Sequence, residues 1–511
     1  MATKREAEYK PLLLTTTMRN PERMRPFLSL LATFKGRQLT DSLCTEIMGE
    51  AIRRGLVQPM KRTPIIKEKW TENTPLSNEE VEWMIENNPQ EHKEAGFARG
   101  WPSRFKTYFG LLMLLGYTYF EVGKPIDISP LGEMFIEEVE TEDGDTYFKY
   151  DEQLVFLNTF VRYHRRNPMQ RVLNHNRPLI LLLEANRELQ RLDGPDSPGI
   201  SRKELAFLIV WRDNDGIGLA RYIHEFRKIH GATASDEVVF DRCDQILGGF
   251  GKVIQVKTIV HEYPDELLRK FRLTGLFSMR GGGRYVANNG DYSALIDYIL
   301  AEHSELFGFR SEREYFEFAS EIDPKLIGLA QEPAKHDSEE VDEHQVSWLE
   351  HFGLETIRKE LVALARQRPS SDSVLKLIPE PLRLEFLSTL LLRGTIASGR
   401  VLGNYRSDDV GFPLSHAPGN SADIEVELGS QIVLYEVTLM KGRVQVHQEL
   451  VPITRHLRER LKKNPESSMF FIAPTIHPDA DQYVAFVKHQ DDLSITNATI
   501  EDFALGSPLL R

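Results

Sequence analysis

Asp423 and Glu436 are acidic residues whose spacing would bring two negative charges face to face. They lie in the expected strands DIEVEL and QIVLYEVTL, which are separated by Gly429-Ser430, a dipeptide suited to a two-residue type II′ turn. If that turn forms, Leu428 pairs with Gln431, and counting back along both strands brings Asp423 opposite Glu436. Opposed residues share a face of the sheet, and like charges there destabilise it.

This pairing is accommodated if one carboxyl is protonated, if both are well solvated, or if a cation lies between them. A hard divalent cation such as Mg²⁺ prefers carboxylate and carbonyl oxygens, so the third alternative gives the pairing a purpose. The second strand is strongly apolar, which indicates that Glu436 is buried where an unpaired charge would be costly. A chain with 76 acidic residues also forms such pairs by chance, so the spacing alone does not establish a metal site, and the apolar strand around Glu436 strengthens that interpretation.

Two further residues could join this site. Glu449 lies as far beyond Glu436 as Glu436 lies beyond Asp423, and His456 follows Glu449 by two helical turns. Pro452 lies between them, so a helix should kink or begin there. Glu385 lies inside an apolar helical stretch, EPLRLEFLSTLLLRG, where an exposed helix edge is the simpler interpretation.

The elements around these residues alternate between helix and strand. SWLEHFGLETIRKELVALARQ has helical apolar spacing, the helix with Glu385 follows, and SSMFFIAPTI is a further apolar strand after the hairpin. This order predicts an α/β domain with a central mixed sheet.

Two N-terminal segments have the order helix, strand, turn, strand that is typical of a winged helix. In the first, RFKTYFGLLMLLGYTYFEVGKPIDIS, Ser129 with Pro130 then starts a further helix. In the second, YPDELLRKFRLTGLFSMRGGGRYVAN, Arg280 and Arg284 flank a glycine-rich hairpin tip suited to lie over a phosphate backbone. An ordinary helix and hairpin is the alternative interpretation.

Basic residues gather in these segments and in a separate island. Residues 161–180 contain five arginines and no acidic residue, and residues 53–69 form a second basic run. A solvated helix face explains one such run, but two runs beside winged segments favour a polyanion as partner. The residues expected to bind DNA are Arg104, Lys106, Arg162, Arg165, Arg166, Arg171, Arg269, Arg272, Arg280 and Arg284.

Composition limits the remaining choices. A chain of 511 residues is too long for one core, so several domains are expected. Two distant cysteines argue against a disulfide framework or a cysteine zinc site and fit a reducing cytoplasm. With neither a signal peptide nor an apolar run of roughly 18 residues, we expect no membrane association. The net charge of −13 argues only mildly against nucleic acid, because local charge decides binding.

A resemblance to a known family is carried by the C-terminal motifs. The segments HAPGNSADIEVEL, YEVTL and QELVPITRHL resemble the catalytic core of the AlwI-like type IIS restriction and nicking endonucleases, the group with PleI, MlyI and BstNBI. That group belongs to the PD-(D/E)xK nuclease class. Near the N-terminus, TTTMRNPERMRPFLSLL resembles the opening segment of the same family.

The resemblance implies roles for individual residues. Asp423 and Glu436 would be ligands of Mg²⁺, with the backbone carbonyl of Val437 as a third ligand. The reaction implied is hydrolysis of a DNA phosphodiester, in which the metal polarises the phosphate and activates a water.

The other active-site residues follow from the same resemblance. Glu449 is the first choice to orient or deprotonate the water and His456 the second, while Glu385 would be a supporting ligand through water. The chain departs from the wider nuclease class at two positions. Ala422 stands where a proline precedes the aspartate, and Thr438 stands where the usual lysine would be, although the EVT form is typical of the AlwI-like group.

The expected fold is multidomain, α+β and α/β. It comprises winged-helix-like DNA-recognition subdomains, a linker, and a PD-(D/E)xK nuclease domain whose central mixed sheet is flanked by helices. The expected boundaries are 1–180 and 181–305 for the subdomains, 306–343 for the linker and 344–511 for the nuclease domain.

The implied function is a type IIS or nicking endonuclease that reads a short asymmetric duplex site and cuts a few bases away. Double-strand cleavage would require a transient homodimer on DNA or a second nuclease subunit. The alternatives are a non-catalytic winged-helix DNA-binding regulator with an inactive nuclease-like domain, and a metal-dependent phosphodiesterase for small substrates. The latter leaves the basic tip at 280–284 unexplained.

Overall fold

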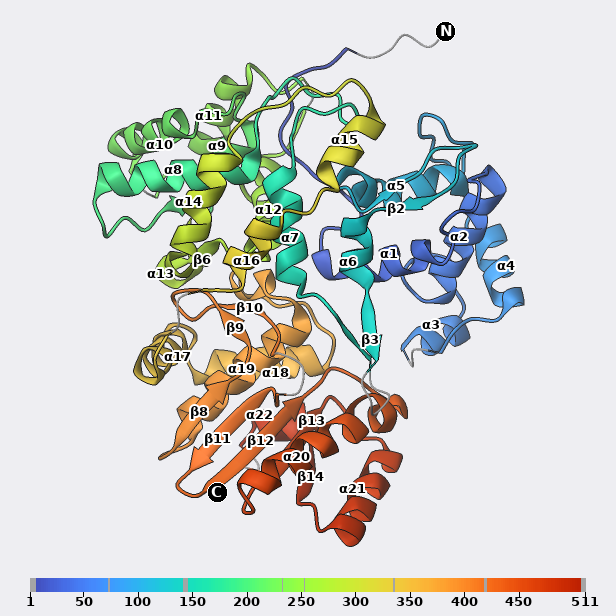
Figure 1. The fold of residues 1–511 in the computed structure, drawn as a ribbon, viewed down its shortest axis with the longest axis vertical. Coiled ribbons are helices and arrows are strands. Elements are labelled where there is room, and N and C mark those ends of the chain that lie inside the picture. Colours follow the sequence, from blue (N-terminus) through green and yellow to red (C-terminus); the bar gives the residue numbers. More distant parts are fainter. Residues whose placement is uncertain are drawn as a thin grey trace. The chain divides into compact units, whose positions relative to one another are not determined.

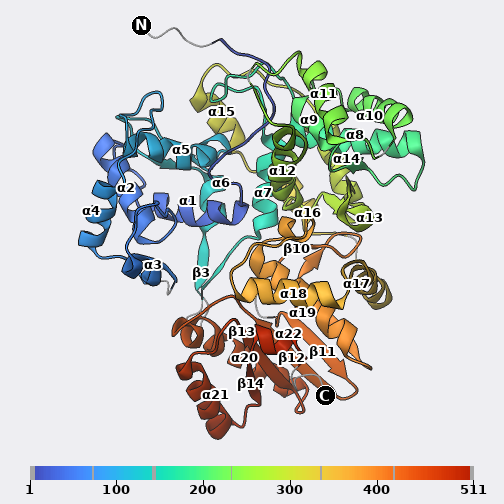
Figure 2. The same ribbon diagram turned by 180° about the vertical axis from the view of Figure 1, so that it is seen from behind.

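The computed structural model describes the chain as two compact units. The described residues are 6–71, 74–140, 146–231, 233–251, 253–333, 336–417 and 421–506. Unit 1 comprises Met1–Val139, Phe148–Phe277 and Tyr285–Pro333, and unit 2 comprises Glu140–Tyr147, Ser278–Arg284 and Ala334–Arg511. Figures 1 and 2 show the elements of both units from opposite sides.

Unit 1 is mostly helical. Its longer helices pair through apolar faces, α2 with α5 and α8 with α10. The helices are α1 (Met24–Ala32), α2 (Asp41–Arg53), α3 (Pro64–Thr71), α4 (Asn78–Asn87), α5 (Trp101–Leu114), α6 (Pro130–Ile136), α7 (Glu152–Arg162), α8 (Pro178–Asp193), α9 (Leu205–Val210), α10 (Gly216–His230), α11 (Asp236–Leu247), α12 (Tyr263–Arg272), α14 (Ser293–Glu302), α15 (Glu312–Ala319) and α16 (Pro324–Ala330). The short strands of this part of the chain are β1 (Thr118–Tyr119), β2 (Asp127–Ile128), β3 (Glu138–Glu140), β4 (Thr146–Phe148), β5 (Ile200–Ser201), β6 (Phe277–Met279) and β7 (Tyr285–Asn288), and parts of β3, β4 and β6 are grouped with unit 2.

Both segments with the expected helix, strand, turn, strand order have that order in the structure. In the first, α5 leads into the antiparallel strands β1 and β2, and the Ser129 side chain caps α6 by accepting a hydrogen bond from Gly132 N. In the second, α12 leads into β6 and β7, which flank the glycine-rich segment. This order alone does not establish a winged helix, which needs a particular helical core as well.

The glycine-rich segment Ser278–Arg284 is grouped with unit 2 although unit 1 supplies the chain on both sides of it. Gly281, Gly282 and Gly283 all have positive φ, and a Cβ at Gly282 would lie 2.4 Å from the His351 ring. Met279 N donates to Asp408 Oδ2 at 3.0 Å. The tip is therefore fixed against unit 2 by close backbone packing.

Unit 2 has a mixed five-stranded sheet of order β14-β13-β12-β11-β8, which confirms the expected central mixed sheet. Strands β8, β11 and β12 pair antiparallel, and β12, β13 and β14 pair parallel. The elements are α17 (Ser338–Phe352), α18 (Leu354–Ala365), α19 (Glu380–Thr395), β8 (Arg400–Gly403), β9 (Arg406–Ser407), β10 (Pro413–Ser415), β11 (Ile424–Leu428), β12 (Gln431–Val437), η5 (Val446–Leu450), α20 (Val451–Lys463), β13 (Ser468–Ala473), α21 (Pro478–Asp491), β14 (Ile495–Thr499) and α22 (Ile500–Ala504).

The two faces of the sheet are covered by different helices. Leu434 of β12 packs in an apolar cluster with Ile453 and Leu457 of α20 and with residues of α21. On the other face, the Tyr435 ring contacts Phe503 of α22, at 6.2 Å between ring centroids. Alternation along β12 therefore assigns Glu436 to the face covered by α20.

The expected linker, residues 306–343, contains α15, α16 and the start of α17. The division between the units falls after Pro333, within that stretch. No helix among the described residues combines the length and apolar character required to cross a membrane.

Candidate active site

The β11–β12 hairpin has the register that the sequence predicts. Its pairs run from Leu428 with Gln431 to Ile424 with Tyr435, so Asp423 and Glu436 are the next opposed residues. Gly429 has φ +65°, as the first position of a type II′ turn requires.

The backbone at the end of this hairpin holds Asp423 in place. Val437 N donates to Asp423 Oδ2 at 2.8 Å, and Asn404 N donates to the Asp423 carbonyl at 3.0 Å. These bonds come from the strands on either side of β11. The carboxylate is thus positioned by the sheet and not by a flexible side-chain contact.

Both opposed carboxyls resist ionisation. Glu436 is a buried residue, with 7% of its surface exposed. Burial is the larger cause and repulsion from Glu449 the smaller cause that raise the pKa of its carboxyl to about 8. Burial and the charges of Glu436 and Glu385 raise the pKa of Asp423 well above its usual value, against the opposing effect of the Val437 N–H. The site therefore gathers acidic side chains, and neither opposed carboxyl is paired with a lysine or arginine of the described residues.

Glu449 lies in the π-helical turn η5 and reaches the same site. The Thr438 hydroxyl donates to Glu449 Oε1 at 2.8 Å, directly after β12. Burial raises the pKa of Glu449, and the hydrogen bond from Thr438 partly opposes that rise. Thr438, where the wider nuclease class has a lysine, thus orients a carboxylate. This contact was not predicted from the sequence.

His456 lies on α20, above Glu436. Its Nδ1 is 3.2 Å from Glu436 Oε1, and burial lowers the pKa of the imidazole, which favours the neutral ring. Helix α20 begins at Val451 with Pro452 in its first turn, as the proline indicated. The helical backbone continues from the π-helical turn η5, which carries Glu449, directly into α20, so the segment is helical through Pro452 with a π-helical turn before it.

Glu385 is buried in α19 at 5% exposure, so its placement on an exposed helix edge is wrong. His416 Nδ1 forms a hydrogen bond to Glu385 Oε1, while Glu385 Oε2 is buried and has no hydrogen-bond partner among the described residues. His416 opens the segment HAPGNSADIEVEL, which was the signal available for it, but no role was predicted for it from the sequence.

The chemistry of these residues fits a hard cation. The donors are carboxylate oxygens, with a main-chain carbonyl at Val437, and Glu385 Oε2 is an orphaned buried acceptor. Within the described residues, no group of three or more His, Cys, Asp or Glu side chains forms a ready-made metal cage. Mg²⁺ typically uses one or two carboxylates, keeps several waters and binds substrate phosphate, so a complete cage is not required.

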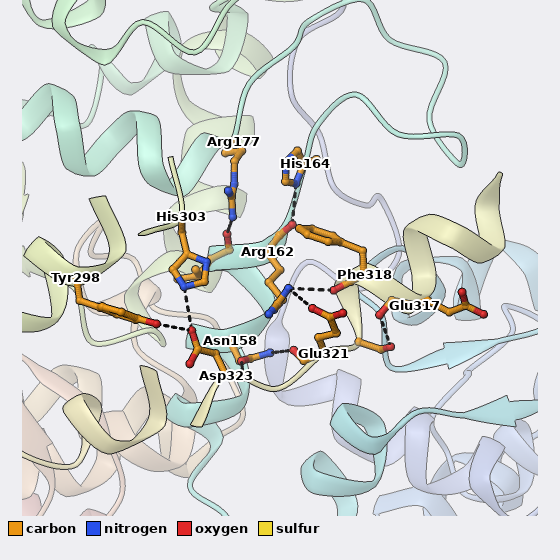
Figure 3. Close-up of polar contacts among 12 residues, drawn as sticks. Asn158, Arg162, His164, Arg177, Tyr298, His303, Glu317, Phe318, Glu321 and Asp323 are labelled. Carbon is orange, nitrogen blue, oxygen red and sulfur yellow. Dashed lines mark hydrogen bonds and ion pairs between the residues drawn. The ribbon is translucent and has the colours of Figure 1, made fainter. Parts of the chain in front are cut away.

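Several residues expected to bind DNA are buried in unit 1. Arg165 and Arg272 are 1% and 3% exposed, and the Arg165 guanidinium donates to the carbonyls of Lys10 and Trp211. Arg162 has a 13% exposed side chain and pairs with Glu321 at 2.8 Å, inside the polar network shown in Figure 3. Burial removes Arg165 and Arg272 from any exposed phosphate-binding surface in this conformation.

Other expected DNA contacts are partly buried against neighbours. Arg104 lies over the Tyr108 ring and Lys106 over the Phe120 ring, each 5.1 Å from the centroid, and burial lowers the pKa of Lys106. The guanidinium of Arg269 donates to Asn20 Oδ1 at 2.7 Å.

The glycine-rich tip differs from the expected free wing. Arg280 forms an ion pair with Asp409 at 2.6 Å, so its guanidinium has an acidic partner within unit 2. Arg284 is exposed, and its Nε donates to Gly281 O at 2.9 Å.

Arg166 and Arg171 are the exposed members of the basic island. They line one cavity of unit 1 together with His175, Arg310 and the rings of Phe307 and Phe309. Of the ten expected DNA contacts, these two and Arg284 are the ones most available to a duplex.

Opposed, buried carboxylates with oxygen donors define the kind of site that metal-dependent hydrolases use. The family described as AlwI restriction endonuclease matches residues 113–347 and 332–503. The chain belongs to this family. A restriction endonuclease is a deoxyribonuclease, so the family supports a type II enzyme of that class. The N-terminal segment at 15–31 lies outside the matched residues.

Similar solved structures are also restriction endonucleases. The small subunit R.BspD6I2 of the heterodimeric restriction endonuclease R.BspD6I is 23% identical over 28% of this chain and 74% of its own, with a TM-score of 0.25. FokI is 12% identical over 98% of this chain and 96% of its own, with a TM-score of 0.22. Similarities this low do not establish a shared architecture. No curated protein matches the chain.

Proposed function

We propose that this protein is a type IIS restriction endonuclease or a site-specific nicking endonuclease of the PD-(D/E)xK class. It binds a short asymmetric duplex site through winged-helix-like subdomains within residues 1–305. It hydrolyses phosphodiester bonds a few bases away, using Mg²⁺ at a nuclease domain formed by residues 344–511. The family match supports the assignment as a restriction endonuclease. The recognition site, the position of cleavage, the use of Mg²⁺ and the roles of the domains are proposed.

One observation carries the proposal. Asp423 and Glu436 are opposed at the end of a hairpin, the first partly buried and the second buried, and desolvation and neighbouring carboxylates raise the pKa of both. Among the residues that the structure describes, no lysine or arginine forms an ion pair with either. A divalent cation would relieve this repulsion, which gives the cluster a physical reason to exist.

The residues that would hold Mg²⁺ are Asp423, Glu436 and the carbonyl of Val437. Bound there, the ion would act as a Lewis acid that lowers the pKa of a water and stabilises charge on the phosphate. Val437 N–H holds Asp423 Oδ2, which leaves Oδ1 for coordination. His456 contacts Glu436 Oε1 and so restricts the orientation of that carboxylate.

Glu449 remains our first choice for the general base. Thr438 holds Oε1 of this carboxylate, so Oε2 can accept a proton from the attacking water. Burial raises the pKa of Glu449, which strengthens it as a base. His456 is the second choice. Its Nδ1 is engaged by Glu436, so in the neutral ring only Nε2 is left to accept a proton from the water.

DNA binding would use the exposed cations of unit 1 and the glycine-rich tip, namely Arg166, Arg171 and Arg284. A single active site cuts one strand. Cleavage of both strands would therefore need a transient homodimer on DNA or a second nuclease subunit.

Supercoiled plasmid incubated with the protein and either Mg²⁺ or EDTA tests this function. We expect discrete linear or nicked products with Mg²⁺ and an unchanged plasmid with EDTA. Plasmids of varied sequence that bind the protein but stay intact in Mg²⁺ would contradict the proposal and support a non-catalytic DNA-binding regulator.

A further inference from the structure

We propose that His416 is a positioning residue of the cleavage reaction, which fixes the Glu385 carboxylate through its Nδ1 and directs the opposite carboxylate oxygen to the metal site. The inference rests on the proposed nuclease function and deepens it. It assigns a residue whose ring lies between the solvent and a buried site carboxylate.

The first observation is the burial of Glu385. It lies on α19 with its side chain 6% exposed, among the apolar residues of that helix. A carboxylate taken from water needs partners, because its desolvation is otherwise uncompensated. His416 supplies one hydrogen bond, from Nδ1 to Glu385 Oε1. When Glu385 is ionised, Nδ1 of His416 carries a hydrogen and donates a hydrogen bond to the carboxylate.

The second observation is the asymmetry between the two oxygens of Glu385. Oε1 is held by His416, while Oε2 is buried and has no hydrogen-bond partner in the part of the chain that the structure describes. The negative charge of Glu385 contributes to the raised pKa of Asp423 and of Glu436, so the carboxylate lies in the field of the opposed pair. A water or cation bound by that pair would satisfy Oε2.

The third observation is the position of His416 in the fold. It directly follows β10, and β10 packs on α19, so the loop places its ring next to Glu385. The His416 side chain is 52% exposed, and its replacement leaves no large cavity. A simple structural role would be to neutralise a buried charge. A positioning role predicts in addition that the geometry of the donated hydrogen bond matters.

The experiment compares His416→Leu, which removes the donor, with His416→Asn, whose side-chain amide can place an N–H near the position of Nδ1. We expect His416→Leu to lower kcat about 10- to 100-fold, the usual range for residues behind a metal ligand, with KM for plasmid unchanged. His416→Asn should recover most of that loss. His489→Leu, an exposed histidine of α21 in the same unit, is the matched control and should match the wild type.

Calorimetric titration of the DNA-free protein with Mg²⁺ supplies a readout apart from activity. Binding should weaken in His416→Leu and return in His416→Asn. Wild-type kcat and Mg²⁺ binding in His416→Leu would overturn the proposal. So would an equal loss of both properties in the Leu and Asn variants, because the donor would then be irrelevant.

A double variant isolates the contact itself. If His416 acts only through Glu385, the variant with both His416→Leu and Glu385→Gln should be no slower than Glu385→Gln alone. Independent, multiplying losses would overturn the inference. Failure of the nuclease function would appear separately, as a wild type that binds Mg²⁺ but cuts no plasmid, and the Mg²⁺ titrations would still test the role of His416.

Discussion

Two groups of like-charged side chains in this chain have different surroundings in the structure. The carboxylates at 385, 423, 436 and 449 come together from four separate elements, and their partners among the described residues are histidines, a hydroxyl and a backbone N–H. The arginines of the N-terminal part are mostly engaged by carbonyls, carboxylates or rings, as Arg162 illustrates in Figure 3.

The difference shows which charges need an external partner. An arginine buried beside carbonyl acceptors is already satisfied, so a basic run in the sequence does not by itself identify a DNA-binding face. Carboxylates that raise one another's pKa are only partly compensated by their hydrogen bonds among the described residues, and a bound cation or a proton would relieve the remaining repulsion. The acidic cluster is therefore the stronger indication of a ligand, even in a protein proposed to bind DNA.

The largest effect should follow from removing a carboxylate of the opposed pair. Asp423→Ala should reduce plasmid cleavage by roughly 10³-fold or more, because it removes a ligand worth several kcal/mol of transition-state stabilisation. Specific DNA binding, measured by gel shift, should stay within a few fold of wild type. Glu427→Ala, on the same hairpin with its side chain 39% exposed, is the control and should cut normally. Loss of DNA binding in a folded Asp423→Ala protein would contradict the expectation that the acidic site cuts DNA while the basic residues bind it.

The second prediction concerns stability without metal. Folded Glu436 keeps its proton up to about pH 8, whereas the unfolded side chain releases it near its ordinary value of 4.5. Between these values the folded state binds more protons, so stability falls as pH rises. Glu436→Gln cannot ionise, so in EDTA its Tm should exceed that of wild type by several degrees at about pH 8.5, since a domain of this size gains about 2–4 °C per kcal/mol.

The control for Glu436→Gln is the pH itself. At about pH 4.5 both side chains are neutral in the folded state, so the two Tm values should converge. Added Mg²⁺ at high pH should raise the Tm of the wild type more than that of the variant. A variant less stable than wild type at every pH would show that Glu436 is compensated internally.

The hairpin was the part of the site most open to prediction from sequence. Turn length and strand register are local properties, so Gly429-Ser430 sufficed to bring Asp423 opposite Glu436. The mixed sheet was predictable for a similar reason, since helix and strand periodicities differ. The contacts of Glu385 with His416 and of Glu449 with Thr438 were not, because they join elements whose approach depends on tertiary packing.

The DNA-binding residues show the opposite limit. Arg165 and Arg166 are neighbours in the same basic run, yet Arg165 is buried and Arg166 is exposed. Charge density along the sequence cannot separate them, because the direction of each side chain depends on the irregular segment after α7. The family resemblance implied the reaction, while which cations are exposed became evident only from the structure.

A third prediction uses that burial. Arg166→Ala with Arg171→Ala should weaken DNA binding about tenfold and make the slope of log affinity against log salt shallower by about 1.8, the value for two lost phosphate contacts. Arg37→Ala is a matched control, because Arg37 is exposed but paired with Glu46 at 2.8 Å. Binding titrations at several salt concentrations measure both slopes. An unchanged slope in the double variant would leave the exposed cavity of unit 1 outside the DNA interface.

The smallest expected effect concerns the one site carboxylate held by a neutral hydroxyl. Thr438→Val keeps the shape of the side chain but removes the hydrogen bond to Glu449 Oε1. A bond of this kind contributes about 0.5–1.5 kcal/mol, so kcat should fall by about 2- to 12-fold with DNA binding unchanged. Thr438→Ser restores the hydroxyl and should restore the rate. Thr438→Lys supplies the cation that is usual in the wider nuclease class. If this variant cuts DNA faster than wild type, the threonine is a defect that the carboxylate cluster tolerates. If it cuts more slowly, Glu449 and the Thr438 hydroxyl together have replaced the lysine.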